Sequence, residues 1–204
     1  MTMAVGLPTL VRLHSASRRV PAAVIVFVAC GVVLRVALKL HWVQGGGASA
    51  QKLPLLIDAG MAAMIAITTY SPFGEPERAT GRWLPWLRLG TAVVLTAFAV
   101  AVLAAGAAAA NLPGGCVDLL RNVAGLTGIG LLSAAVLGGM LAWIGPVAYL
   151  VIAEVSLTQV WTSPWIWPAR APHDLAAASC AATVFAAGLV IVTVRGARDS
   201  EALR

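Results

Sequence analysis

The sequence predicts an all-α, polytopic membrane protein of about six transmembrane helices with both termini in the cytoplasm. Three observations lead to this fold class: 60% of the 204 residues are hydrophobic, only 11% are charged, and the mean hydropathy is +0.89. A soluble domain usually carries about a quarter charged residues. So few charges cannot cover a water-facing surface, and lipid must therefore be the main solvent of the chain.

Six apolar windows are long enough to span a bilayer. The hydrocarbon core needs roughly 20 residues of helix, because each residue rises about 1.5 Å. Unpaired backbone groups are costly in lipid and no strand-like alternation occurs, so each window is predicted to be helical. The windows form a single transmembrane domain over 1–204, with spans at about 20–40, 54–72, 88–110, 119–141, 143–160 and 174–195.

The fourth and fifth windows allow two interpretations. Residues 123–153 contain no charge and are too long for one span without strong tilt. Gly145 and Pro146 interrupt this stretch, since proline removes a helical hydrogen bond and glycine loosens the turn. Two helices joined by a tight turn near 143–146 are the preferred prediction. One long kinked helix, giving five spans, is the alternative.

Arginine and lysine are divided unequally between the connections. With six spans and the N-terminus inside, nine of these residues are on the inner side and five on the outer side, as the positive-inside rule requires. We therefore expect a multi-pass protein of the cell membrane, and no nucleic-acid partner for its net charge of +6. The inner set is Arg12, Arg18, Arg19, Arg78, Arg82, Arg88, Arg195, Arg198 and Arg204, and the outer set is Arg35, Lys39, Lys52, Arg121 and Arg170.

Tryptophans gather in two connections. Three of them lie with two prolines within residues 161–168. Amphipathic indole rings prefer the headgroup level, so this segment is predicted to lie at the outer interface, as an anchor rather than a binding element. Trp83 and Trp86 are expected to do the same on the inner face.

Two ionisable residues lie inside predicted spans, Asp58 in the second and Glu154 in the fifth. Charged groups inside a bilayer are costly, and suggest ion pairing, a proton relay or contact with a substrate. The alternative is that each side chain reaches water near a membrane end. Asp118 and Arg121 are three residues apart at the head of the fourth span, a spacing that allows them to pair and fix the helix end.

Small residues recur every four positions in the fourth window. Such a row lets another helix approach closely, within the chain or from a second copy. It predicts tight helix packing and no chemistry. The row consists of Gly130, Ala134, Gly138 and Ala142.

No residue pattern predicts catalysis, a metal or a cofactor. The three cysteines are unclustered and the three histidines lie in different connections. The sequence also lacks the phosphate loop, the Gly-x-Ser-x-Gly elbow and the His-Glu-x-x-His motif. We therefore expect no enzyme activity, and the chain cannot hydrolyse ATP alone.

The inner connection over residues 71–88 combines two acids, three arginines and two tryptophans. This composition offers charged and aromatic surface to a cytoplasmic partner. The alternative is a solvated connector that contacts headgroups.

Several segments resemble the small permease subunits of actinobacterial ABC-2-type exporters. They are Ser-Pro-Phe-Gly-Glu-Pro-Glu-Arg at 71–78, Leu-Leu-Arg-Asn-Val-Ala-Gly-Leu-Thr-Gly at 119–128, Leu141-Ala142-Trp143 through Pro146 and Tyr149, and Trp-Ile-Trp-Pro at 165–168. The resemblance extends over most of the chain, although its motifs are diffuse. The large extracellular helices of many such exporters have no room here.

The resemblance implies a permease that works with a separate ATPase and forms a dimer or joins a second permease. It also implies that the inner loop receives the motion of the ATPase, and that Asp58 and Glu154 line a path for a substrate whose identity stays open. The candidate coupling residues are Phe73, Glu75, Glu77, Arg78 and Arg82.

Two other classes of protein compete with this interpretation. A membrane-embedded enzyme or lipid-handling protein needs polar residues clustered at one depth, which the scattered Asp58, Asp118, Glu154 and His173 do not provide in the sequence. A non-transporting scaffold or regulatory subunit would recruit cytoplasmic partners through the 71–88 loop.

Overall fold

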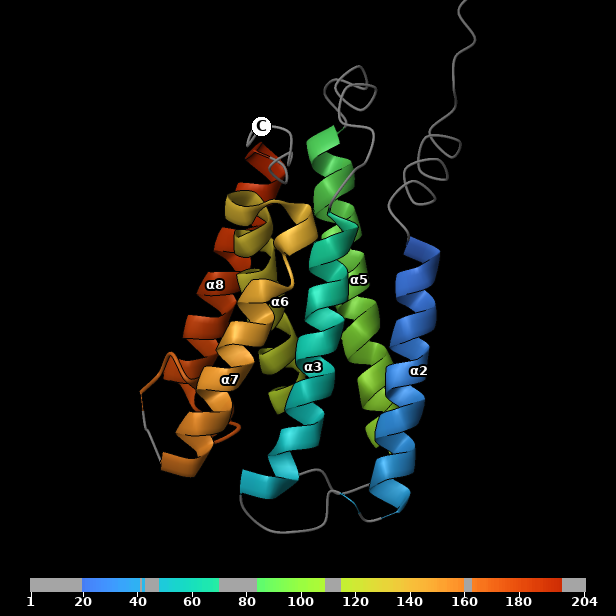
Figure 1. Cartoon of the computed structure of the whole chain (residues 1–204), viewed down its shortest axis with the longest axis vertical. Helices are drawn as coiled ribbons and strands as arrows, with labels where there is room; N and C mark the ends of the chain where they lie inside the picture. The colour runs from blue at the N-terminus through green and yellow to red at the C-terminus, as the bar shows by residue number, and fades with distance from the viewer. Residues whose placement is uncertain are drawn as a thin grey trace, which may run out of the picture.

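A computed structural model of the chain describes residues 20–40, 42, 48–69, 84–108, 115–159 and 163–195. These residues form six long α-helices and two single-turn 3₁₀ helices (Figure 1). The long helices are α2 (Val20–Lys39), α3 (Ala48–Thr68), α5 (Leu84–Ala107), α6 (Gly115–Leu137), α7 (Ile144–Gln159) and α8 (Leu175–Arg195). The 3₁₀ helices are η2 (Gly139–Leu141) and η3 (Trp167–Ala169).

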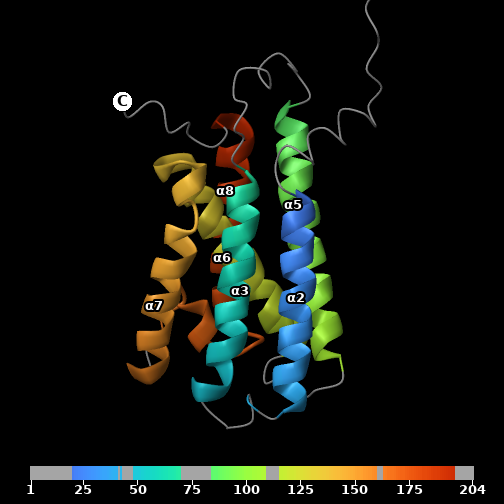
Figure 2. The same ribbon diagram turned by 45° about the vertical axis from the view of Figure 1, so that its right-hand side comes forward.

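Successive long helices run up and down through one bundle (Figures 1 and 2). The start of α2, the end of α3, the start of α5, the α6–α7 turn and the end of α8 therefore share one end, which we call the terminal end. The start of α3, the start of α6 and the η3 segment share the other, which we call the opposite end. The chain thus enters and leaves the bundle on the same side, as an even number of crossings requires.

The helices are those of a multi-pass membrane protein. Five stretches of the described residues are long and apolar enough to cross a membrane: α2, α6, α8, most of α5, and η2 with most of α7. The remaining helix, α3, runs the length of the same bundle and packs on α2, α6 and α7. Large apolar side chains point outward from the bundle, such as Ile25 on α2, Val94 on α5 and Val194 on α8. This surface suits lipid, and the prediction of an all-α, multi-pass membrane protein is confirmed, while the cytoplasmic location of the termini stays a prediction.

Helix α6 lies at the centre of the bundle and packs most extensively on α8 and α3. Its contact with α8 depends on Gly128 and Gly188. A Cβ atom on Gly128 would lie 2.6 Å from the backbone of Val184 and Phe185, and one on Gly188 would lie 2.7 Å from the carbonyl oxygen of Gly128. The two backbones touch because neither residue has a side chain.

The uncharged stretch over 123–153 contains two helices, so the alternative of one long kinked helix is wrong. The break differs from the predicted position at 143–146. Helix α6 ends at Leu137, and Gly138 adopts a φ of 92°, a left-handed conformation that glycine adopts without strain. Pro146 instead lies in the first turn of α7, where a missing N–H costs no helical hydrogen bond.

Three helices begin earlier than the apolar windows. Helix α3 begins at Ala48 instead of residue 54, α5 at Leu84 instead of 88, and α6 at Gly115 instead of 119. Helices continue past the apolar window because polar residues at membrane ends can remain helical in the headgroup layer. Pro54 is accordingly inside α3, within its second turn.

Candidate functional site

Asp58 occupies the middle of the bundle. It is the eleventh of the 21 residues of α3, and its side chain is completely buried. Neither carboxyl oxygen has a hydrogen-bond partner. Its position excludes the alternative in which Asp58 reaches water at a membrane end. A buried carboxyl without a partner is costly, so this residue is the strongest candidate for function.

Asn122 on α6 is the polar neighbour of Asp58. The two side chains interact across the α3–α6 contact, although neither carboxyl oxygen of Asp58 accepts a hydrogen bond of ordinary geometry. The Oδ1 atom of Asn122 also has no hydrogen-bond partner. Helices α3 and α6 run in the same direction through the bundle (Figure 2).

Asp118 extends this polar set toward the opposite end of the bundle. It precedes Asn122 by four residues, so both lie on one face of α6. Asp118 acts electrostatically on Asp58, and the imidazole of His173 acts on Asp118 in turn. His173 is exposed and precedes α8. These four residues, which we call the polar column, connect the buried Asp58 to the opposite end.

The expected ion pair between Asp118 and Arg121 forms, and Arg121 also binds the segment that precedes α8. Arg121 Nη2 donates to Asp118 Oδ1 at 2.6 Å, and Nη1 donates to the carbonyl oxygen of Ala171 at 2.8 Å. A third bond, from Nη2 to the carbonyl oxygen of Arg170, measures 3.3 Å. The guanidinium is buried, so Arg121 ties the segment before α8 to the head of α6.

Asp174 begins α8. Its Oδ1 accepts hydrogen bonds from the backbone N–H groups of Ala176 (2.9 Å) and Ala177 (3.1 Å), while Arg170 Nε donates to Oδ2 at 2.6 Å. These donors, above all the N–H of Ala177, hold the pKa of the Asp174 carboxyl below its ordinary value. Such a residue satisfies backbone donors that the first turn of a helix leaves unpaired.

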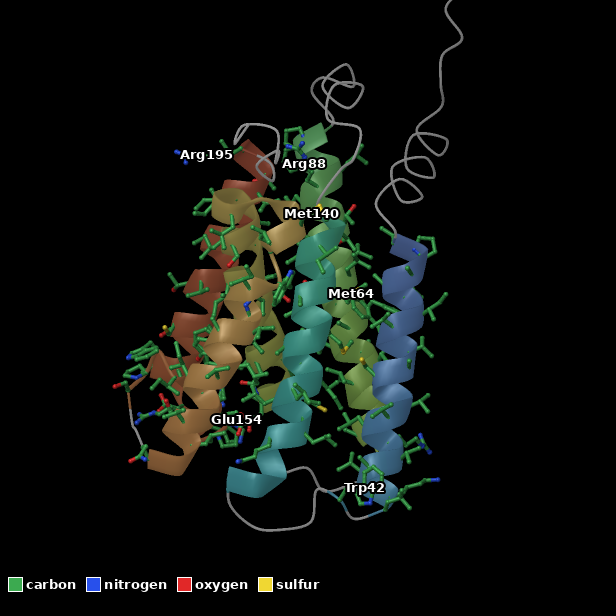
Figure 3. All side chains as sticks on the ribbon, viewed as in Figure 1. Trp42, Met64, Arg88, Met140, Glu154 and Arg195 are labelled. Atoms are coloured by element: carbon green, nitrogen blue, oxygen red, sulfur yellow. The ribbon has the colours of Figure 1, made fainter. Side chains whose placement is uncertain are left out.

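Glu154 does not join Asp58. It pairs with Lys52 at 3.3 Å between α7 and α3, near the opposite end, where Figure 3 labels it. Both side chains are partly exposed, so the pair contributes at most about 1 kcal/mol to stability. The two predicted path-lining residues therefore occupy different environments, one ion-paired at the rim and one buried in the middle.

The tryptophan-rich segment enters the bundle instead of only lying at its interface. Trp167 is buried and stacks on Tyr149 of α7, with ring centroids 4.6 Å apart. Its ring fits against Gly125 of α6, where a Cβ atom would lie 2.5 Å from it. The Tyr149 hydroxyl donates to the carbonyl oxygen of Trp165 at 2.8 Å. The anchor interpretation is thus wrong for Trp167, while the exposed Trp165 remains suited to it.

The small-residue row lies against α3 of the same chain, but it is not one helical row. A Cβ atom on Gly130 would lie 2.8 Å from Ala66, and Ala66 clusters with Ala134 and Ala142. Gly138 ends α6, however, so Ala142 belongs to the following turn. The four-residue spacing of the sequence therefore continues past the end of α6, but its last two members do not lie on that helix.

The candidate coupling residues lie outside the described residues, and so does Trp83. Phe73, Glu75, Glu77, Arg78 and Arg82 all fall in the segment between α3 and α5. Trp86 is described and is exposed on the first turn of α5, at the terminal end.

The described residues contain no group of three or more histidine, cysteine, aspartate or glutamate side chains able to hold a metal ion. Sequence spacing did not indicate Asn122, Trp167 or the Gly128–Gly188 contact. Asn122 carries a weak signal, an amide within an apolar window. No protein-family model, curated protein or solved structure matches this chain.

Proposed function

We propose that this chain is the membrane-spanning permease subunit of an ATP-driven export system and works with a separate ATPase. The observation that carries the proposal is the shared terminal end of the bundle. Helix α3 ends and α5 begins at the end where the chain enters α2 and leaves α8. The 70–83 connection therefore joins two helices at the side that the arginine count assigns to the cytoplasm.

Two further features support a permease. The sequence has no phosphate loop, so any ATP-driven motion must come from a partner. The bundle also holds a buried, unpartnered carboxyl at Asp58, the kind of intramembrane group that often marks a transport path. The resemblance of residues 71–78 and 119–128 to ABC-2-type permeases agrees with both.

A second permease, identical or different, completes the proposed complex. The outward faces of α2, α5, α7 and α8 carry large apolar side chains. Such faces suit either lipid or another membrane helix, so the complex has room for a second subunit without rearrangement of the bundle.

The test is affinity purification of the detergent-solubilised chain from its native membranes, followed by mass spectrometry. We expect an ATPase in stoichiometric amount, and its loss when Glu75, Glu77 and Arg78 are all replaced by alanine. The matched control replaces Arg35 and Lys39, two exposed cations near the opposite end, and should retain the ATPase. Recovery of the chain alone, or only with partners that are not ATPases, would favour the scaffold alternative.

A further inference from the structure

The α3–α6 contact brings together acceptor atoms without a donor. Both carboxyl oxygens of Asp58 and Oδ1 of Asn122 have no hydrogen-bond partner, and Asp58 is fully buried. A fully satisfied polar group is the rule in a protein interior, and the more so in a membrane. These three acceptor oxygens therefore lack a hydrogen-bond donor or a cation.

A single proton completes this arrangement. A protonated Asp58 donates its O–H to Oδ1 of Asn122, and Nδ2 of Asn122 can donate back to the other carboxyl oxygen. A hard metal cation does not fit as well, because Ca²⁺ and Mg²⁺ require about six or more oxygen ligands. Only three free oxygens meet here, and the described residues offer no cluster of three metal-binding side chains.

The polar column provides a route for that proton. Asp118 lies one turn, roughly 6 Å, below Asn122 along α6. It interacts with Asp58 above it and with the exposed His173 below it. Titratable and amide side chains thus follow one another from solvent at the opposite end to the middle of the bundle.

Other charged groups on the helices around α3 are engaged elsewhere or distant. On α6, Arg121 is bound to Asp118; on α7, Glu154 is bound to Lys52. On α2, Arg35 and Lys39 are exposed, and on α5, Arg88 lies at the terminal end (Figure 3). Within the described part of the chain, Asp118 is the ionisable group that acts on Asp58.

We propose that Asp58, hydrogen-bonded by Asn122, is a proton-binding site that exchanges with the solution at the opposite end by way of Asp118. Binding forms the O–H bond of the carboxylic acid, and release returns the proton to water by way of the Asp118 carboxylate. The inference goes beyond the exporter proposal and does not require the ATPase, because the isolated chain contains every group involved.

Infrared difference spectroscopy of the purified full chain in lipid vesicles tests the proposal between about pH 4 and pH 10. A protonated carboxyl gives a C=O stretching band that its ionised form lacks. Other carboxyls contribute bands near pH 4, so the informative signal is the difference between the two proteins. We expect the wild type to show a titrating band that is lost as pH rises and that Asp58→Asn lacks at every pH. Glu154→Gln, the matched control at the rim, should keep it. Identical spectra for wild type and Asp58→Asn, or an Asp58 band that never titrates, would overturn the proposal.

A second measurement tests the proposal without the Asp58→Asn variant, in case that variant does not fold. Wild-type chain made with ¹³C-labelled aspartate shifts any aspartate C=O band, and the same labelling of a chain that carries Asp118→Asn, Asp174→Asn and Asp199→Asn removes the contributions of the other three aspartates. A titrating aspartate band that survives these three substitutions supports the assignment to Asp58, and its absence contradicts it. The route is tested by a pH jump: Asp118→Asn should slow loss of the band, and an unchanged rate would refute the route.

Discussion

Gly128→Ala places a methyl group against the backbone of α8 and should loosen the most extensive helix contact of the bundle. The added Cβ would lie 2.6 Å from the Cα and N atoms of Phe185 and from the carbonyl oxygen of Val184. Ordinary contact begins at 3.4 Å, so α6 and α8 must separate locally by about 0.8 Å. Backbone atoms cannot rotate away as a flexible side chain can. Such overpacking typically costs about 1–3 kcal/mol.

The native cysteines provide the assay. Cys180 lies half-buried on α8, whereas Cys116 is exposed, so Cys116→Ser removes the background of a thiol-reactive fluorogenic dye. Heating then reports unfolding as Cys30 and Cys180 become reactive. We expect Gly128→Ala to lower Tm by several degrees, since about 1 kcal/mol corresponds to roughly 2–4 °C for a chain of this size.

Gly60→Ala is the matched control. Gly60 is exposed on α3, and a Cβ atom there meets nothing within 4 Å. Alanine is favoured over glycine in a helix by up to about 1 kcal/mol, so this variant should be unchanged or slightly more stable. An equal Tm for Gly128→Ala and wild type would refute the close approach of α6 and α8.

Three further predictions concern the opposite end of the bundle. Arg121→Ala removes the guanidinium that donates to the Asp118 carboxylate and to the carbonyls of Ala171 and Arg170, at a cost of about 3–5 kcal/mol, and hydrogen exchange over 163–177 should accelerate; unchanged exchange would show that Arg121 does not hold this segment against α6. Trp167→Ala removes a buried ring and should destabilise by about 3–5 kcal/mol in the same thermal assay, whereas Trp165→Ala, at an exposed position, should have little effect; equal losses would contradict the burial of Trp167. The pKa of Asp174 is lower in the folded chain than its ordinary value of about 3.9, so its stabilisation of α8 is present above that pH and is lost as pH falls through the folded value. The protection of amide hydrogens in the first turn of α8, measured against the intrinsic exchange rate at each pH, should therefore fall in acid, and Asp174→Asn, which keeps a capping side chain, should remove that pH dependence.

Apolar length predicts the helices well, since every predicted span corresponds to a helix of the bundle. The helix ends are less predictable, because a hydropathy window stops where polar residues begin and a helix does not. Gly145 and Pro146 were the conspicuous breakers, yet proline is tolerated in a first turn and the inconspicuous Gly138 makes the break.

The polar column illustrates what spacing along one chain cannot reveal. The second half of α3, the whole of α5 and two connections separate Asp58 from Asn122 in the sequence, and the two residues meet because α3 and α6 run in parallel. From its spacing, Asp118 was expected only to pair with Arg121 at the end of α6, but it also interacts electrostatically with Asp58. Trp167 looked like an anchor because its neighbours are tryptophan and proline, but the notch at Gly125 that receives it lies some forty residues away.

The proposed coupling loop depends on the orientation of the bundle, which also decides to which side of the membrane the proton route opens. Native Cys116 is exposed at the start of α6, at the opposite end. With Cys30→Ala and Cys180→Ala it becomes the single thiol of the chain. A membrane-impermeant maleimide applied to intact cells should label it, while a single cysteine at Glu77→Cys, with all three native cysteines replaced, should react only after the membrane is opened.

That labelling experiment is the most direct test of the account. Labelling of Cys116 from outside, with protection of position 77, places the 70–83 connection in the cytoplasm, where an ATPase can reach it. The reverse pattern would put this loop outside the cell and contradict the proposed function.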